Sequence, residues 1–219
     1  YNWIQDNIKK VDKATNGKVG YIYIPDMGPE GLNEFSRYFY PQLDKEGLII
    51  DDRANGGGNV SPMILERLSR EPYRLTMRRG SSLIGTVPDA VQVGPKVCLI
   101  NKYSASDGDL FPWGFRALGL GKLIGTRTWG GIIGISGPLP YMDGTDIRVP
   151  FFTSYDPKTG NWIIENHGVD PDILIDNDPI KEWNGEDQQL DRAIEEVMKQ
   201  LKERKPLAPV PAPRDWSHK

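Results

Sequence analysis

Three apolar runs of strand length, each followed by a segment with a helical pattern, constrain most strongly how this chain folds. They are VGYIYI at 19–24, LIID at 48–51 and VCLIN at 97–101. Strands that are apolar on both sides are typical of a parallel sheet whose two faces are covered by helices. The sequence therefore predicts an α/β domain with a parallel sheet flanked by helices. The expected helices span about 31–43, 61–69 and 107–118.

The ends and the second half of the chain have other patterns. Apolar residues recur at helical spacing in 2–12 and in 188–204, and we expect the second of these helices to pack on the core by its apolar stripe. Because PLAPVPAPRDW is rich in proline, we expect one domain over residues 1–205 and an extended arm over residues 206–219. Short apolar runs predict a β-rich second half, at 123–125, 131–136, 147–152, 162–165 and 173–175.

Charge and composition argue against several classes of function. The chain has 27 basic and 30 acidic residues, a net charge of −3 and no block of basic residues, so we expect neither a nucleic-acid partner nor a membrane partner. The single cysteine, Cys98, lies in an apolar run and is expected to pack in the core. Since the chain starts at Tyr1 and not at methionine, we expect a piece of a longer protein, and its compartment stays open.

The segment NKYSASDGDLF at 101–111 carries the strongest candidate for chemistry. Ser106 stands where an apolar strand ends and a helix begins, beside the unpaired amides of the helix start. That position suits a nucleophile, and we expect the N–H of Asp107 to point to where an acyl oxyanion forms, while Asp109 caps the helix. A plainer interpretation is that Ser106 or Asp107 serves only as an N-cap.

Three consecutive glycines at 56–58 follow the second apolar strand and lead toward a helix. Glycine reaches backbone conformations that are barred to other residues and lets the main chain approach a ligand closely, as an oxyanion hole requires. The run matches neither the phosphate-binding nor the dinucleotide-binding glycine pattern. The alternative is a flexible surface turn.

Glu165 and His167 form a third candidate group, in ENHGVDPD. Glu165 is predicted to end an apolar strand, where a carboxylate often has a function; the alternative is a solvated strand end. His167 is one of two histidines, and the other, His218, lies in the proline-rich arm, so His167 is the intrinsic candidate for a general base. No cluster of residues has the spacing of metal ligands, so we predict no metal site.

Six segments resemble, in the same order, those of tricorn-type enzymes in the C-terminal-processing serine peptidase family. Ordered matches of this length over most of the chain are specific to a family. The matching segments are GYIYIPDMGPEGLNEF, LIIDDRANGGG, SASDGD, LGLGKLIGTRTWGG, ENHGVDPDI and QQLDRAIEEV.

The resemblance implies a core of the Clp-peptidase and crotonase-like type that hydrolyses short peptides without a cofactor. It implies that Ser106 is the nucleophile, that the amides of Gly58 and Asp107 bind the oxyanion, and that Glu165 orients the base. In tricorn-type enzymes this base is a histidine in a subdomain upstream of a PDZ domain, and neither part matches this sequence. The resemblance also implies a parent protein that forms homo-oligomers.

The sequence departs from the family at two places. Processing peptidases of the wider family use a lysine about two dozen residues after the serine, and Gly131 stands at that position, which excludes a serine–lysine dyad. Tricorn-type enzymes also have an acidic residue that selects basic P1 side chains, whereas YRLTMRRG offers Leu75 or Thr76. The P1 preference is therefore left open.

Two other functions are compatible with the same scaffold. One is a binding module without catalysis, and the other is a crotonase-type acyl-CoA enzyme, which also uses paired amides. Neither of them needs Ser106, Gly58 and Glu165 together, so the sequence favours the peptidase.

Overall fold

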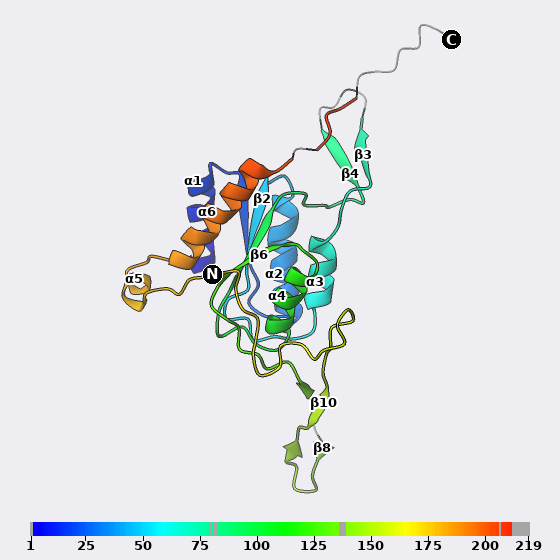
Figure 1. Cartoon of the computed structure of the whole chain (residues 1–219), viewed down its shortest axis with the longest axis vertical. Coiled ribbons are helices and arrows are strands. Elements are labelled where there is room, and N and C mark those ends of the chain that lie inside the picture. Colours follow the sequence, from blue (N-terminus) through cyan, green and yellow to red (C-terminus); the bar gives the residue numbers. More distant parts are fainter. Residues whose placement is uncertain (1, 79, 81–82, 136–138, 206, 212–219) are drawn as a thin grey trace, which may run out of the picture.

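Five parallel strands form the central sheet in the computed structural model, which describes residues 2–78, 80, 83–135, 139–205 and 207–211. The strands lie in the order β1, β2, β5, β6 and β11, and each pair of neighbours is parallel (Figure 1). The predicted parallel sheet is confirmed, and the carboxyl ends of its strands meet at one edge. The bounds are Val19–Tyr23, Gly47–Asp51, Lys96–Ile100, Gly121–Gly125 and Ile173–Leu174.

Helices cover both faces of this sheet, as the fully apolar strands require. On one face lie α2 (Pro29–Phe39), α3 (Ser61–Leu68) and α4 (Asp107–Ala117), and on the other lie α1 (Asn2–Thr15) and α6 (Gln188–Glu203) (Figure 1). Side chains alternate along each strand, so every central strand contributes to two hydrophobic cores. The first core includes Phe35, Phe39, Ile50, Cys98, Phe111 and Phe115; the second includes Val11, Ile49, Val97, Leu190 and Val197.

The second half of the chain adds two strands to the main sheet and an arm of short strands. The β-rich prediction is confirmed for β6 and β11, while the remaining strands form small ladders, with β10 paired to β7 and β9 paired to β8. Figure 1 shows this arm projecting from the lower end of the molecule. The arm strands are β7 (Gly134–Ile135), β8 (Leu139–Pro140), β9 (Asp146–Ile147) and β10 (Pro150–Phe152).

The strand predicted at 162–165 is wrong. Trp162 forms a single bridge with Tyr155, and Glu165 lies in a turn. Within that turn the amides of His167 and Gly168 both donate to the Ile164 carbonyl, at 3.0 and 2.8 Å. These local hydrogen bonds satisfy the main chain without a neighbouring strand, so apolar pattern alone misassigned the segment.

Three elements were not predicted from the apolar pattern of the sequence. The hairpin of β3 (Arg74–Met77) and β4 (Ile84–Val87) is largely exposed, and α5 (Pro179–Trp183) is a short helix capped by the Asp178 carboxylate. A 3₁₀ turn, Tyr40–Gln42, follows α2.

In the predicted C-terminal arm, 207–211 form neither helix nor strand, and its other residues lie outside the described part. No helix of the described chain is long and apolar enough to cross a bilayer.

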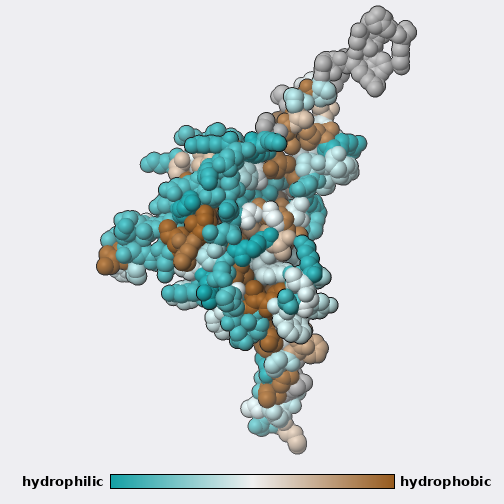
Figure 2. Space-filling view, in the orientation of Figure 1, coloured by the Kyte–Doolittle hydropathy of each residue, from teal (hydrophilic) through white to brown (hydrophobic). Residues whose placement is uncertain are grey.

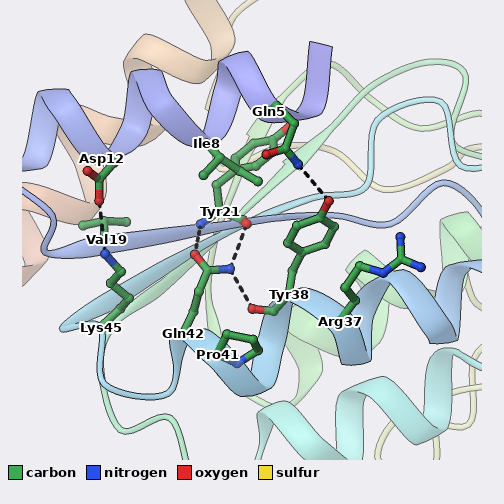
Figure 3. A pocket seen from close by; sticks show the side chains of 10 residues that line it. All are labelled: Gln5, Ile8, Asp12, Val19, Tyr21, Arg37, Tyr38, Pro41, Gln42 and Lys45. Carbon is green, nitrogen blue, oxygen red and sulfur yellow. Dashed lines mark hydrogen bonds and ion pairs between the residues drawn. The ribbon is translucent and has the colours of Figure 1, made fainter. Parts of the chain in front are cut away.

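A side-chain amide protects the exposed edge of the sheet at β1. Gln42 Oε1 accepts from the Tyr21 N–H at 3.0 Å, and Gln42 Nε2 donates to the Tyr21 carbonyl at 3.1 Å (Figure 3). The side chain thus replaces a neighbouring strand and blocks edge pairing with another chain. A cavity of about 360 Å³ lies beside it, crossed by the hydrogen bond from Gln5 to Tyr38.

A buried ion-pair network holds α6 to the carboxyl end of β2. The Arg53 guanidinium bridges the carboxylates of Asp51 and Asp187, at 2.6 and 2.8 Å. The Tyr21 hydroxyl donates to the same Asp51 at 2.6 Å. A guanidinium that bonds two carboxylates holds them rigidly. The start of the segment that follows β2 is therefore fixed relative to the start of α6.

Candidate active site

Ser106 lies in the turn between β5 and α4, in a backbone conformation that side chains rarely adopt. Its φ is 56° and its ψ is −121°. For a residue with a Cβ atom this combination stores strain of about 1–3 kcal/mol. Such strain persists only where surrounding contacts fix the backbone, and it is concentrated at functional sites.

The Ser106 hydroxyl does not cap the helix. Ser106 occupies the N-cap position of α4, yet its side chain makes no capping hydrogen bond and the residue is exposed. The amides of Asp109 and Leu110 are instead satisfied by the Ser106 carbonyl, at 2.9 and 3.1 Å. The hydroxyl is therefore accessible to a substrate, and the simple N-cap interpretation does not describe it.

Hydrogen bonds join the Ser106 turn to the segment that follows β2. They connect residues about fifty positions apart, and together they fix the strained backbone from one side. With the donor first, they are Ala54 N to Asn101 Oδ1 (2.9 Å), Ser104 Oγ to Asp52 O (2.8 Å), Ala105 N to Asn55 O (2.8 Å) and Ser61 N to Asp107 Oδ2 (2.9 Å).

This close approach requires two of the three consecutive glycines. Gly57 has a φ of 95° and Gly58 a φ of 150°, both in the range that favours glycine. A Cβ atom on Gly57 would lie 2.6 Å from the Ser106 Cβ, and one on Gly58 would lie 2.0 Å from the Met27 carbonyl oxygen. The glycine run is thus packed against the Ser106 turn and is not a free surface loop.

The amides of Gly58 and Asp107 have no protein acceptor within the described residues. Met27 pairs with the two neighbours of Gly58: its N–H donates to Gly57 O at 2.9 Å, and its carbonyl accepts from Asn59 N at 2.7 Å. The Gly58 N–H is skipped by this pattern. Two unpaired amides beside an exposed hydroxyl are the donor arrangement that an oxyanion needs.

The Asp107 carboxylate has a structural role that the sequence did not reveal. It is buried and accepts hydrogen bonds from both the N–H and the hydroxyl of Ser61, the first residue of α3. An acidic side chain near two helix N-termini is also favoured by the helix dipoles. This contact locks the starts of α3 and α4 together and so fixes the direction of the Asp107 N–H.

Asp109 connects α4 to the segment that leaves β6. Its carboxylate accepts from the N–H groups of Gly130 and Gly131, at 2.8 and 3.3 Å. Burial raises the pKa of Asp109, while hydrogen bonds from Thr128, from these two glycines and from the Ser106 amide lower it. Asp109 thus serves both the helix start and this link, and Gly131 contributes only main-chain atoms.

Glu165 holds the same segment from the other side. Its Oε2 accepts from the amides of Ile132 and Ile133, at 2.7 and 2.9 Å, and the side chain is half-buried. The segment is also bonded to the Ser106 turn, because the Trp129 N–H donates to the Ser104 carbonyl at 2.9 Å. Glu165 therefore belongs to the same edge of the sheet as Ser106, although it reaches that edge from a turn and not from a strand.

His167 is turned toward a different partner. Its Nε2 lies 2.7 Å from Asp170 Oδ2, and this hydrogen bond is the main reason why the pKa of Asp170 is lowered. The ring lines a cavity with Arg116 and Ala117, near the C-terminal end of α4. Ser106 lies at the opposite end of that helix, and no hydrogen bond links it to His167 within the described residues.

Asp52 is a buried carboxyl group in the segment that bonds the Ser106 turn, since its carbonyl accepts from the Ser104 hydroxyl. Its side chain is fully buried, and within the described part of the chain neither oxygen has a hydrogen-bond partner. Burial raises the pKa of Asp52 well above its ordinary value, and the nearby Asp51 raises it further.

The described residues contain no group of three or more His, Cys, Asp or Glu side chains arranged to hold a metal ion.

A family model matches the part of the chain that builds this geometry. Residues 18–175 match Peptidase family S41, and this range contains all five strands of the central sheet and each candidate residue above. The chain belongs to peptidase family S41.

Individual relatives extend the likeness of this S41 domain to tricorn proteases. Tricorn protease of Thermoplasma volcanium is 43% identical over 203 residues, covering 93% of this chain and 20% of the relative. Tricorn protease of Thermoplasma acidophilum is 41% identical, covering 92% and 19%. Tricorn protease homolog 1 of Streptomyces coelicolor is 37% identical, also covering 92% and 19%. The S41 domain thus spans about one fifth of the length of these relatives and is similar to the C-terminal region of tricorn protease.

Solved structures confirm the fold. The crystal structure of tricorn protease superposes with a TM-score of 0.85 at 41% identity, over 91% of this chain and 19% of that chain. The photosystem II D1 C-terminal processing protease gives a TM-score of 0.52 at 22% identity, over 72% and 42% of the two chains. The second likeness shows the fold alone. The predicted α/β peptidase core is therefore confirmed.

Asn55 organises the candidate site, although it was not predicted from the sequence. Its buried side chain donates to the Ile24 carbonyl at 3.1 Å and accepts from the Gly57 N–H at 2.9 Å, while its own carbonyl accepts from Ala105. One residue thereby connects two strand ends and the Ser106 turn. An asparagine directly before a glycine run is the available signal, since its amide can bond main-chain groups on both sides.

Leu75 and Thr76, proposed at the position that selects the P1 side chain, lie on β3. Figure 1 shows the β3–β4 hairpin at the upper end of the molecule, opposite the arm that leaves the carboxyl edge of the sheet. The chain that leads into the hairpin passes Lys96, the first residue of β5. Within one copy of the S41 domain, this hairpin is therefore remote from Ser106.

Proposed function

We infer that this domain is the nucleophile-bearing part of a serine peptidase that cleaves short peptides through an acyl-enzyme at Ser106. The observation that carries this proposal is the exposed Ser106 hydroxyl in a strained turn, next to the unpaired amides of Gly58 and Asp107. A serine used only for helix capping has no need of strain or of free donors. Membership of a peptidase family agrees with this assignment.

The chemistry follows from these positions. A general base takes the proton of the Ser106 hydroxyl while its oxygen attacks the peptide carbonyl carbon. The amides of Gly58 and Asp107 stabilise the negative oxygen of the tetrahedral intermediate; one such donor contributes about 3 kcal/mol. The base then returns the proton to the leaving amine, and water releases the acyl group by the reverse sequence. No cofactor takes part in these steps.

The base comes from outside this chain. Gly131 has no side chain, and His167 lies at the end of α4 that is opposite to Ser106. We assign the base to a histidine in an upstream subdomain of the parent protein, where a PDZ domain and homo-oligomer contacts are also expected. The arm of short strands β7 to β10 offers a surface for such contacts, because it exposes large apolar side chains (Figure 2). They include Ile135, Tyr141, Met142, Ile147, Phe151 and Phe152.

Labelling with a fluorophosphonate tests the proposal. The reagent reacts with a serine only when that serine is activated, so the intact parent protein should carry one adduct, which peptide mass spectrometry maps to Ser106. A Ser36→Ala variant on α2 should keep the adduct, since the Ser36 hydroxyl donates to the Leu32 carbonyl of its own helix. An adduct on another residue, or none in a protein that hydrolyses peptides, would remove Ser106 as the nucleophile. A parent protein with neither an adduct nor peptide hydrolysis would favour the binding-module or the acyl-CoA alternative.

Replacing Glu165 by glutamine should lower kcat by at least about tenfold and change KM little. Glutamine keeps an oxygen that can accept from Ile132 and Ile133, so the variant removes the charge but not the hydrogen bonds that hold the segment. The charge is proposed to stabilise a base that becomes positive in the transition state. Steady-state kinetics of the parent enzyme measures the effect, and a change confined to KM would reassign Glu165 to substrate contact.

A further inference from the structure

A cavity opens beside the start of α4, between α3 and the loop over residues 154–163. Its volume is about 610 Å³, within the range of pockets that hold small molecules. The loop that forms its outer wall is closed on itself, because Tyr155 pairs with Trp162 and the Ile163 N–H donates to the Ser154 carbonyl. The cavity is therefore bounded by two helices and a braced loop.

This cavity begins at the residue that is proposed to bind the oxyanion. Asp107 lines it, and the N–H of the same residue is one of the two free donors. Leu110 lines it as well and lies one helical turn from Ser106, to whose carbonyl its amide is bonded. A carbonyl group bound at Ser106 would thus bring its neighbouring side chain to the mouth of the cavity.

The lining is mainly apolar. Gly114 forms a close contact between the helices, where a Cβ atom would lie 2.5 Å from Leu65 Cδ1, so the cavity floor is tightly packed. No lysine, arginine or histidine of the described residues lines it. The apolar residues of the lining include Pro62, Leu65, Leu110, Trp113, Leu118, Pro157 and Ile163.

Both acidic side chains at the cavity are already engaged. Asp107 is buried and accepts from the N–H and the hydroxyl of Ser61. Glu66 is exposed at the rim and accepts from Arg70 Nε at 2.8 Å. A basic substrate side chain would therefore enter without a free buried carboxylate to pair with, which is unfavourable for a charge.

We propose that this cavity binds the side chain of the substrate residue whose carbonyl Ser106 attacks, and that it selects a large apolar side chain. The inference rests on the proposed function and adds the substrate class. Burial of an apolar side chain against Leu65, Leu110 and Trp113 supplies the selectivity.

Fluorogenic peptides that differ only in the residue before the cleaved bond test this specificity on the parent enzyme. With alanine, leucine, phenylalanine, lysine or glutamate at that position and one leaving group, kcat/KM should be at least about tenfold higher for leucine and phenylalanine than for alanine, lysine and glutamate. Lysine equal to or better than phenylalanine would overturn the inference.

Two variants test whether this cavity is the source of the preference. Leu110→Asp and Leu118→Asp should each lower the ratio of kcat/KM for phenylalanine over lysine by at least about tenfold, because a carboxylate in the lining favours a cation. Leu118 is 54% exposed at the end of α4, so its variant should fold even if Leu110→Asp does not. The matched control is Met63→Asp on α3, which is 57% exposed and lines a different cavity, and it should leave the ratio unchanged.

The outcomes separate the inference from the proposed function. If the wild-type parent is not labelled by fluorophosphonate at Ser106, the proposed function fails. If Ser106 is labelled but the ratio is unchanged in a folded Leu118→Asp variant, or changes equally in Met63→Asp, the cavity assignment is wrong and the proposed function stands. A shift confined to the cavity variants supports the inference.

Discussion

Replacing Ser106 by alanine in the parent protein should lower kcat/KM for peptide hydrolysis by about 10³-fold or more. The variant removes the only atom that forms the acyl bond, while the amides of Gly58 and Asp107 stay in place. The oxyanion donors can still accelerate attack by water, so activity falls to a residual rate and not to zero. Hydrolysis of a fluorogenic peptide by wild type and variant, at matched protein concentration, measures the loss.

Stability distinguishes loss of chemistry from loss of structure. Because Ser106 is exposed and alanine keeps its Cβ atom, the free energy of unfolding should change by less than about 1 kcal/mol. Ser106→Gly should be equally inactive but more stable than Ser106→Ala by about 1 kcal/mol, since glycine relieves the strain of a φ of 56°. An alanine variant that retains more than a few per cent of wild-type activity would contradict the nucleophile assignment.

The isolated chain should fold but hydrolyse peptides about 10²- to 10⁴-fold more slowly than the parent, which is the contribution of a general base. The chain contains the strained serine, the free amides and Glu165. Among the described residues no side chain is placed to take the Ser106 proton, because His167 lies near the opposite end of α4 and Gly131 stands at the alternative position.

Three proteins decide this second prediction. They are the isolated chain, its His167→Ala variant and a chain extended upstream to include the missing subdomain, each checked for cooperative unfolding. Only the extended protein should turn over peptides at the rate of the parent, and His167→Ala should not change the residual rate of the short chain. Robust activity of the short chain that disappears in His167→Ala would refute a base supplied from outside and make this domain a complete hydrolase.

Local pattern was sufficient for the central elements. The runs at 19–24, 48–51 and 97–101 are apolar on both sides, which is typical of strands in a parallel sheet with both faces covered. The helices after them were predicted within a few residues, since their apolar periodicity is set by the same two cores. Ser106 was placed correctly at a strand-to-helix turn for the same reason.

Pattern failed where hydrogen bonds replaced burial. Glu165 was predicted to end a strand, but its segment is a turn whose amides bond the Ile164 carbonyl, and its carboxylate bonds the main chain at Ile132 and Ile133. The β3–β4 hairpin was missed because its strands have four residues each and are largely exposed, so the alternation in Arg74–Met77 is too short to stand out.

The sequence by itself determined the central strands and helices, their parallel arrangement and the residue types of the site, because these depend on burial and on backbone preferences of neighbouring residues. Only the tertiary structure decided which groups meet. The contacts of Ala105 with Asn55 and of Asp107 with Ser61 join segments about fifty residues apart. Neither partner has a local pattern that specifies the other, yet these contacts hold the Ser106 backbone in its strained conformation and leave two amides unpaired.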